Sequence, residues 1–125
     1  MIIVNVMICD DARFMLMVIE RLFTKLGHTV KYRALNGLEA IETYQRYWSD
    51  IDIVTLDVVM PSMDGIQVLK RIMQINPNAK VVVVTSINSK HIVDGALRLG
   101  AKDFLTKPFR LSEFIRVINK VLSQP

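Results

Sequence analysis

The sequence predicts a single α/β domain: an open, doubly wound parallel sheet of five strands with helices on both faces. Three observations lead to this prediction. The chain has 125 residues, which is the length of one domain. Short apolar runs alternate with amphipathic helical segments along the whole chain. One run, 80–85, holds four consecutive valines, which is typical of a strand buried on both faces.

The first half of the chain contains three predicted strands and two predicted helices. The apolar runs 2–9, 29–34 and 51–56 are the strands. A helix over 12–26 is predicted because apolar residues recur at helical spacing and a glycine follows. Its apolar stripe consists of Met15, Ile19, Leu22, Phe23 and Leu26. A second helix, over 37–48, has Asn36 in position to cap its first turn.

The second half continues the alternation after a loop. Residues 57–65 are predicted to form this loop, because Pro61 and Gly65 interrupt regular structure. A helix over 66–75, the valine-rich strand 80–85, a helix that ends at Leu99 and a fifth strand over 101–105 follow. Gly95 lies inside the fourth helix and costs about 1 kcal/mol relative to alanine. Apolar residues on one face predict the last helix, over 111–122.

Composition excludes several classes of protein. With 51% hydrophobic and 22% charged residues, the chain is not intrinsically disordered. No apolar run approaches the roughly 18–20 residues of a membrane-spanning helix, and the first run lacks the basic start of a signal peptide. The net charge of +4 is scattered, which argues against nucleic-acid binding.

Cysteine and histidine give no sign of a metal cluster. Cys9 is the only cysteine, so we expect a buried small hydrophobe, no disulfide and a reducing, cytoplasmic environment. His28 follows a helix-ending glycine and is expected in a surface turn. His91 has no partner at metal-ligand spacing.

Polar residues follow the predicted strands in a regular way. The first strand ends at Asp10 and Asp11, the third at Asp57 and the fourth at Thr85, and Lys107 follows the fifth. The carboxyl ends of parallel strands meet at one edge, where doubly wound sheets bind their ligands. Three carboxylates there repel one another, and one Mg²⁺ together with one lysine would balance their charge. The sequence therefore predicts a magnesium site at this edge.

Such a site can transfer phosphoryl groups. An aspartate beside Mg²⁺ and a lysine can attack phosphorus, which here would give an acyl phosphate on Asp57. Lys107 can pair with one phosphoryl oxygen, and the hydroxyl of Thr85 can donate to another. Movement of Thr85 would vacate space that Phe104, on the fifth strand, can fill. We therefore expect Thr85 and Phe104 to form a two-state switch.

Simpler interpretations exist for several of these residues. Asp10 and Asp11 alone could cap the first helix, as Asp64 is expected to cap the third. Phe104 could be an ordinary core residue. An aspartate-dependent phosphatase of the haloacid-dehalogenase type would carry a second aspartate two positions after its nucleophile, and Val59 occupies that position.

Taken in order, the motifs resemble the receiver domain of two-component response regulators, especially the stand-alone CheY-like type. The resemblance covers essentially the whole chain and rests on residues 9–11 (CDD), 57–65 (DVVMPSMDG), 85–86 (TS) and 104–109 (FLTKPF). It implies a flavodoxin-like sheet of order 2-1-3-4-5, one receiver domain over 1–125, and a signalling switch rather than an enzyme. It also implies a phosphohistidine donor on a sensor histidine kinase or a histidine phosphotransfer domain.

The resemblance implies roles for individual residues as well. Asp57 would be the phosphoacceptor, and the Lys107–Pro108 peptide bond would be cis. Magnesium would be held by Asp11, Asp57 and the backbone carbonyl of Val59, with Asp10 acting through water.

Two departures from the family pattern limit the comparison. Phe104 stands where a tyrosine is common, which removes a phenol hydroxyl. Val59 and Ile87, two positions after Asp57 and Thr85, are apolar where polar residues often orient water. We therefore predict slow self-dephosphorylation.

Partner surfaces are predicted in two places. On the first helix, four residues lie off the core stripe: Phe14, Met17, Val18 and Arg21. They predict a docking face for the histidine-bearing partner, unless the core stripe is simply wide. The fourth helix, fifth strand and fifth helix are expected to bind an acidic downstream protein through Arg98, Lys102, Arg110 and Lys120.

We expect no direct contact with nucleic acid or membrane, and a monomer or weak homodimer. An isolated receiver domain of a larger regulator, with a DNA-binding or enzymatic output domain, remains the alternative. Motility control, phosphorelay and transcription are not separated by the sequence.

Overall fold

The computed structural model describes residues 2–60, 63–86 and 90–125. Its centre is a parallel five-stranded sheet in the order β2-β1-β3-β6-β7. The strands are β1 (Asn5–Cys9), β2 (Thr29–Ala34), β3 (Ile53–Leu56), β6 (Val81–Thr85) and β7 (Asp103–Thr106). Because β6 and β7 are the fourth and fifth strands of this sheet, the predicted doubly wound order 2-1-3-4-5 is confirmed.

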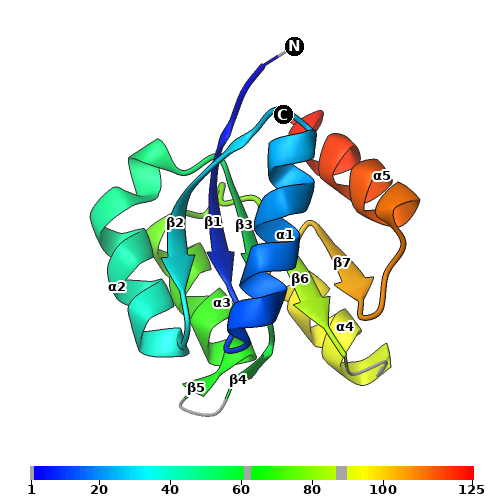
Figure 1. The fold of residues 1–125 in the computed structure, drawn as a ribbon. Helices are drawn as coiled ribbons and strands as arrows, with labels where there is room; N and C mark the ends of the chain where they lie inside the picture. Colours follow the sequence, from blue (N-terminus) through cyan, green and yellow to red (C-terminus); the bar gives the residue numbers. More distant parts are fainter. Residues whose placement is uncertain (1, 61–62, 87–89) are drawn as a thin grey trace.

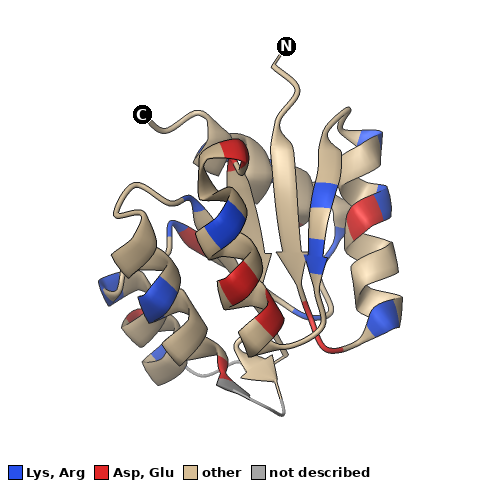
Figure 2. Ribbon diagram, turned by 90° about the vertical axis from the view of Figure 1, so that its left-hand side faces the viewer, with Lys and Arg blue, Asp and Glu red and all other residues tan. Residues whose placement is uncertain are grey.

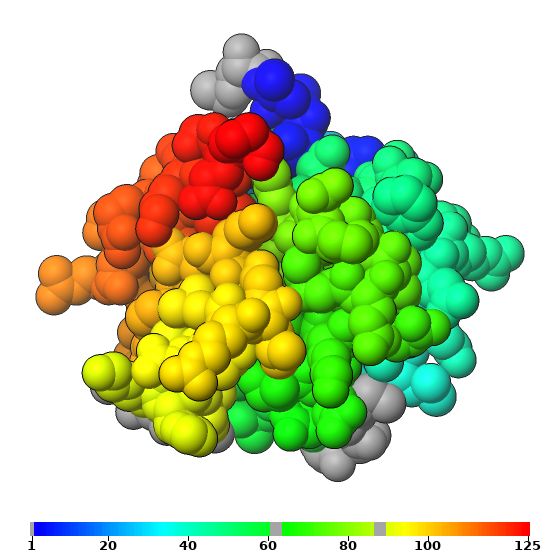
Figure 3. All heavy atoms as spheres, turned by 180° about the vertical axis from the view of Figure 1, so that it is seen from behind, coloured from blue at the N-terminus to red at the C-terminus, as the bar shows by residue number. Residues whose placement is uncertain are grey.

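Helices cover both faces of the sheet. On one face lie α1 (Arg13–Lys25) and α5 (Leu111–Leu122), which stand in front of the strands in Figure 1. On the other lie α2 (Gly37–Tyr47), α3 (Gly65–Ile75) and α4 (Lys90–Arg98). Figure 3 shows this second face, with α3 in green between the teal of α2 and the yellow of α4.

Each face of the sheet has its own hydrophobic core. Under α1 and α5, Phe23 and Phe114 meet edge to face with ring centroids 5.0 Å apart. Under α2, α3 and α4, Tyr44, Leu69 and Ile72 are fully buried. The valines of β6 alternate between the two cores, which explains why the whole run is apolar.

The first and third strands are shorter than predicted. Ile2 and Ile3 are exposed, and β1 begins only at Asn5, where pairing with β2 and β3 becomes possible. A short 3-10 helix, η1 (Trp48–Asp50), precedes the third strand, which begins at Ile53. Apolar character alone does not extend a strand, because its backbone groups also need a neighbouring strand to form hydrogen bonds with.

The predicted loop 57–65 contains regular structure. Two short strands, β4 (Val59–Met60) and β5 (Met63–Asp64), pair antiparallel beyond the edge of the main sheet (Figure 1). Pro61 lies outside the described residues. As expected, Asp64 caps α3 by accepting from the N–H of Ile66, and Asn36 caps α2 by accepting from the N–H of Glu39.

His28 is not a surface turn residue, as the sequence had suggested. Only 9% of it is exposed, and its Nδ1 accepts a hydrogen bond from the N–H of Val4 at 3.2 Å. Its ring also lies edge-on to Phe23. The turn that follows Gly27 folds back onto the start of the sheet, and this buries the imidazole.

Cys9 is buried in the core as predicted, and burial raises the pKa of its thiol. Among the described residues, no helix is both long and apolar enough to cross a bilayer.

Candidate functional site

At the carboxyl edge of the sheet, backbone hydrogen bonds also hold the residue that directly follows each of three strands. The N–H of Asp10 donates to the last carbonyl of β2 at 3.1 Å, and that of Asp57 donates to the last carbonyl of β1 at 3.0 Å. The N–H of Lys107 donates to the last carbonyl of β6 at 2.8 Å. Three chemically active residues are therefore held in register by the sheet itself.

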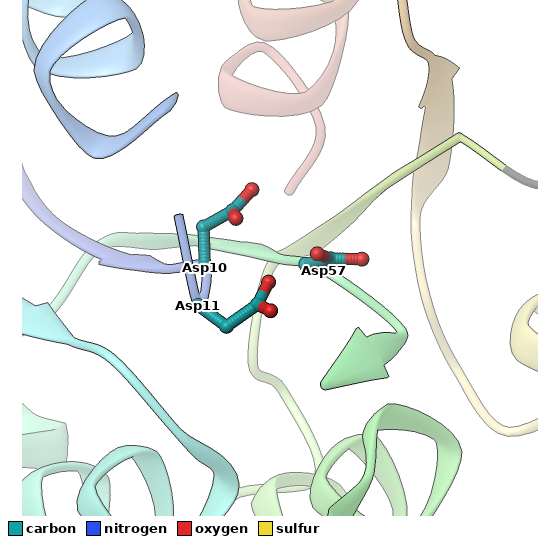
Figure 4. Close-up of side chains that lie close together, drawn as sticks. All are labelled: Asp10, Asp11 and Asp57. Atoms are coloured by element: carbon teal, nitrogen blue, oxygen red, sulfur yellow. The ribbon is translucent and has the colours of Figure 1, made fainter. Parts of the chain in front are cut away.

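Three carboxylates converge at this edge. Asp10, Asp11 and Asp57 each offer an oxygen, and these oxygens lie within 4.8 Å of one another. Figure 4 shows Asp10 and Asp11 from the end of β1 beside Asp57 from the end of β3. Asp10 and Asp57 are buried, whereas Asp11 is exposed. A set of carboxylate oxygens open to solvent on one side suits Mg²⁺, which prefers oxygen ligands and keeps several waters.

Lys107, which follows the edge strand β7, reaches across to the carboxylates. Its Nζ lies 3.0 Å from Asp10 Oδ2 and 3.5 Å from Asp57 Oδ2. The remaining oxygens point to backbone donors: Asp57 Oδ1 accepts from the N–H of Val59 at 2.9 Å, and Asp10 Oδ1 accepts from the N–H of Ala12 at 3.0 Å. One ammonium pairs with two of the three clustered carboxylates, so the negative charge of the cluster is only partly balanced.

The capping interpretation of Asp10 and Asp11 is wrong. The N-cap of α1 is Ala12, and no side chain caps this helix. Asp10 Oδ1 bonds the N–H of the N-cap residue itself, which is not a cap of the first turn, and an oxygen of each aspartate lies in the acidic cluster.

The electrostatics of Asp57 favour a bound cation. Burial raises the pKa of this carboxyl, and the nearby carboxylates of Asp10 and Asp11 act in the same direction. The N–H of Val59 and the ammonium of Lys107 oppose the shift without cancelling it. Holding Asp57 ionised thus has a cost, which a divalent cation would offset.

The proposed switch residues lie on neighbouring strands, but not opposite each other: Thr85 pairs with Thr106, and Phe104 pairs with Val83. Thr85 ends β6 and is fully buried, whereas Phe104 on β7 is 36% exposed and so lies outside the core. Ile87, which with Val59 formed the basis for predicting slow dephosphorylation, lies outside the described residues. Val59 itself is exposed at the start of β4. The Lys107–Pro108 peptide bond is cis.

The predicted partner surfaces are also placed. On α1, Phe14 is 69% exposed, Met17 is 43% exposed, Arg21 is exposed and Val18 is half-buried. On the other surface, Arg98 and Arg110 are exposed and Lys102 is half-buried. Lys120 is engaged, because its Nζ lies 3.1 Å from Asp103 Oδ2.

Thr55, which lies two positions before Asp57 on β3, was not among the predicted site residues. It is 1% exposed, and its hydroxyl has no hydrogen-bond partner within the described part of the chain. The only signal was a polar residue inside an otherwise apolar strand.

Comparison with known proteins agrees with this geometry. The family model described as "Response regulator receiver domain" matches residues 6–119. The chemotaxis protein CheY of Thermotoga maritima is 45% identical over 117 residues, covering 94% of this chain and 96% of that protein. The chemotaxis protein CheY of Bacillus subtilis is 40% identical over 119 residues, covering 95% and 98%. The sporulation initiation phosphotransferase F of Bacillus subtilis is 30% identical over 118 residues, covering 94% and 93%.

A solved structure is similar throughout the fold. A chain in the crystal structure of the CheX-CheY-BeF3-Mg²⁺ complex from Borrelia burgdorferi superposes with a TM-score of 0.93 at 35% identity. The alignment covers 97% of this chain and 90% of that one. Together with the acidic edge and its lysine, these likenesses show that the chain belongs to the response regulator receiver domain family, as a CheY-like member.

Proposed function

We propose that the chain is a phosphorylation-dependent switch. In this proposal Asp57 accepts a phosphoryl group from a phosphohistidine donor, and the α4, β7 and α5 surface then binds a downstream protein. The residues 1–125 would act as one receiver domain. The observation that carries the proposal is the meeting of Asp10, Asp11, Asp57 and Lys107 at one edge of the sheet.

The chemistry follows from the positions of these groups. A carboxylate oxygen of Asp57 attacks phosphorus, the P–N bond to the donor imidazole breaks, and the departing imidazole nitrogen takes up a proton. Asp11, Asp57 and the backbone carbonyl of Val59 would hold Mg²⁺, with Asp10 acting through water, and the ion would neutralise charge on the phosphoryl oxygens. Lys107, now paired with Asp10 and Asp57, can turn to a phosphoryl oxygen without leaving the site.

A small phosphodonor tests the reaction directly. Incubation with acetyl phosphate and Mg²⁺ should add one phosphoryl mass to the protein, and peptide mapping should place it on Asp57. Asp57→Asn and removal of Mg²⁺ with a chelator should each abolish labelling. Asp64→Asn is the matched control, because the side chain of Asp64 caps α3 and is not one of the three clustered carboxylates. Labelling that persists in Asp57→Asn, or that ignores the chelator, would contradict the proposal.

We further propose that the donor protein docks on α1. Phe14→Asp should slow transfer from the donor by about tenfold while small-donor labelling continues, because only the protein contact is removed. Leu38→Asp places the same charge on another exposed apolar site, on α2, and should have little effect. If both transfer and small-donor labelling fall together in Phe14→Asp, the docking role fails.

We propose slow self-dephosphorylation for the reason given by the sequence. Val59 and Ile87 present no polar group that could orient an attacking water. The double variant Val59→Asn, Ile87→Glu should therefore lose its phosphoryl group faster than the wild type. Equal lifetimes would contradict this explanation.

The relatives favour a downstream target in chemotaxis. The two CheY proteins, at 45% and 40% identity, resemble this chain more than the sporulation phosphotransferase does at 30%. A phosphorelay role is the second candidate.

A further inference from the structure

A groove runs along α1 on the side that faces β2. It has a volume of about 970 Å³ and extends from Arg13 near the acidic edge to Lys25 at the far end of the helix. Its apolar lining comes from Leu16, Met17, Val18 and Leu22. Of these, Met17 is 43% exposed, so the groove has an apolar surface accessible to a partner.

The groove is surrounded by positive charge. Four of its lining residues are cations, namely Arg13, Arg21, Lys25 and Arg33, and one, Glu20, is an anion. Figure 2 looks at this edge of the sheet, where blue bands mark both β2 and α1. Three cations therefore remain in excess on one flank of the molecule.

The single carboxylate is not available to compensate this excess. Arg33 Nε donates to Glu20 Oε1 at 2.7 Å, and Arg33 Nη2 donates to Glu20 Oε2, so the two side chains form a two-pronged ion pair. For Arg13, Arg21 and Lys25, the described residues provide no ion-pair partner. The pair also fastens α1 to β2, which keeps the groove in shape.

We propose that the protein partner docking on α1 presents an acidic amphipathic segment to this groove. Its apolar side chains would cover Met17 and Leu22, and its carboxylates would meet Arg13, Arg21 and Lys25. This inference rests on the proposed docking role of α1 and adds the chemistry of the partner. Nucleic acid is the other anionic occupant, but phosphates gain nothing from an apolar floor.

Two synthetic helical peptides and one oligonucleotide test the inference. The first peptide carries leucines on one face flanked by glutamates, and the second replaces every glutamate by lysine. A single-stranded oligonucleotide represents nucleic acid. Binding is followed by fluorescence anisotropy and by amide chemical shifts of the labelled protein. The glutamate peptide should bind, shift residues of α1 and β2, and weaken as salt rises. The lysine peptide should not bind.

Two charge-reversal variants separate the groove from net charge. Arg21→Glu should weaken binding of the glutamate peptide at least tenfold. Lys70→Glu changes the net charge by the same amount at an exposed site on α3 and should weaken it less than twofold. Thermal unfolding of both variants checks that the fold is intact.

Several outcomes would overturn the inference. These are equal weakening by the two variants, shifts spread over all basic surfaces, binding of the lysine peptide, or tighter binding of the oligonucleotide to the same residues. Failure of acetyl phosphate to label Asp57 would instead contradict the proposed function. It would not change the result of the peptide binding experiment, so the two failures can be told apart.

Discussion

The buried hydroxyl of Thr55 has a cost that can be measured. It lies in the core next to the acidic edge, with no partner among the described residues, and an unpaired buried hydroxyl typically costs about 1–3 kcal/mol. Thr55→Val keeps the shape and removes the hydroxyl. The free energy of unfolding, measured with urea, should therefore rise by about 1 kcal/mol.

Thr55→Ser is the matched control, since it retains the hydroxyl and removes a buried methyl group. It should lower the free energy of unfolding by roughly 1 kcal/mol. A loss of stability in Thr55→Val would mean that an ordered water pairs with the hydroxyl in solution.

His28 should make stability depend on pH. Burial lowers its pKa in the folded state, and the hydrogen bond from Val4 requires an unprotonated Nδ1. As pH falls below about 6.5, the unfolded chain takes up this proton before the folded protein does. The free energy of unfolding should therefore fall, by at most about 1.4 kcal/mol per pH unit. Urea unfolding at pH 7.5, 6.5 and 5.5 measures the slope.

The second histidine supplies the comparison. His28→Gln should flatten the slope between pH 7.5 and 5.5, whereas His91→Gln, at an exposed position on α4, should leave it as in the wild type. A slope that survives in His28→Gln would assign the proton uptake to another group.

At the scale of elements, two glycines should respond in opposite directions to alanine. A Cβ on Gly65 would lie 2.2 Å from Val58 Cα and 2.6 Å from the carbonyl oxygen of Asp57. Gly65→Ala must therefore push the start of α3 away from Asp57 and Val58, and it should lower the free energy of unfolding by about 2 kcal/mol or more. The free energy of unfolding, measured by denaturation, and the extent of labelling by acetyl phosphate should both fall.

Gly95 is the counterpart inside α4. A Cβ there would meet no heavy atom within 4 Å, so Gly95→Ala should raise the free energy of unfolding by about 0.5–1 kcal/mol through helix propensity. If both alanine variants were destabilised equally, close packing at Gly65 would not explain the first result.

Sequence pattern predicted the five main strands and five helices because each has a long apolar repeat. It did not predict β4 and β5, since two-residue strands are too short to show any period. The sequence predicted which residues are buried less well than it predicted the helices and strands. Leu16 is buried although it lay outside the predicted stripe, because α1 packs at an angle that a helical repeat does not specify.

The acidic edge could be predicted only from the topology of the whole sheet. Asp10 and Asp57 are far apart in sequence, yet parallel strands bring their ends together, so topology alone placed both carboxylates. Topology could not show that Lys107 lies nearer to Asp10 than to Asp57, because this depends on the side-chain conformation. Nor could it show that the Thr55 hydroxyl finds no partner among the residues that the structure describes, because hydrogen bonding is set by packing in three dimensions.

The proposed transmission of a signal from Asp57 to the α4, β7 and α5 surface involves several elements of the fold. Asp57 directly follows β3, Thr85 ends the adjacent β6, and Phe104 lies on β7 at the edge of the sheet, so a path from Asp57 to Phe104 crosses neighbouring strands. We expect beryllofluoride with Mg²⁺, which mimics the phosphoryl group, to shift amide signals of α4, β7 and α5. Thr85→Val should reduce these shifts by more than half while beryllofluoride still binds, because in the proposed mechanism the hydroxyl of Thr85 would donate to the phosphoryl oxygen.

Thr106 provides the control, because it lies opposite Thr85 on the edge strand β7 and carries the same chemical group. Thr106→Val changes the same chemical group and should leave the shifts of α4, β7 and α5 close to those of the wild type. Wild-type shifts in Thr85→Val would mean that the surface senses phosphorylation by another route. The remaining candidate would then be Lys107, whose backbone N–H is already bonded to the carbonyl of Thr85 and whose ammonium faces Asp57.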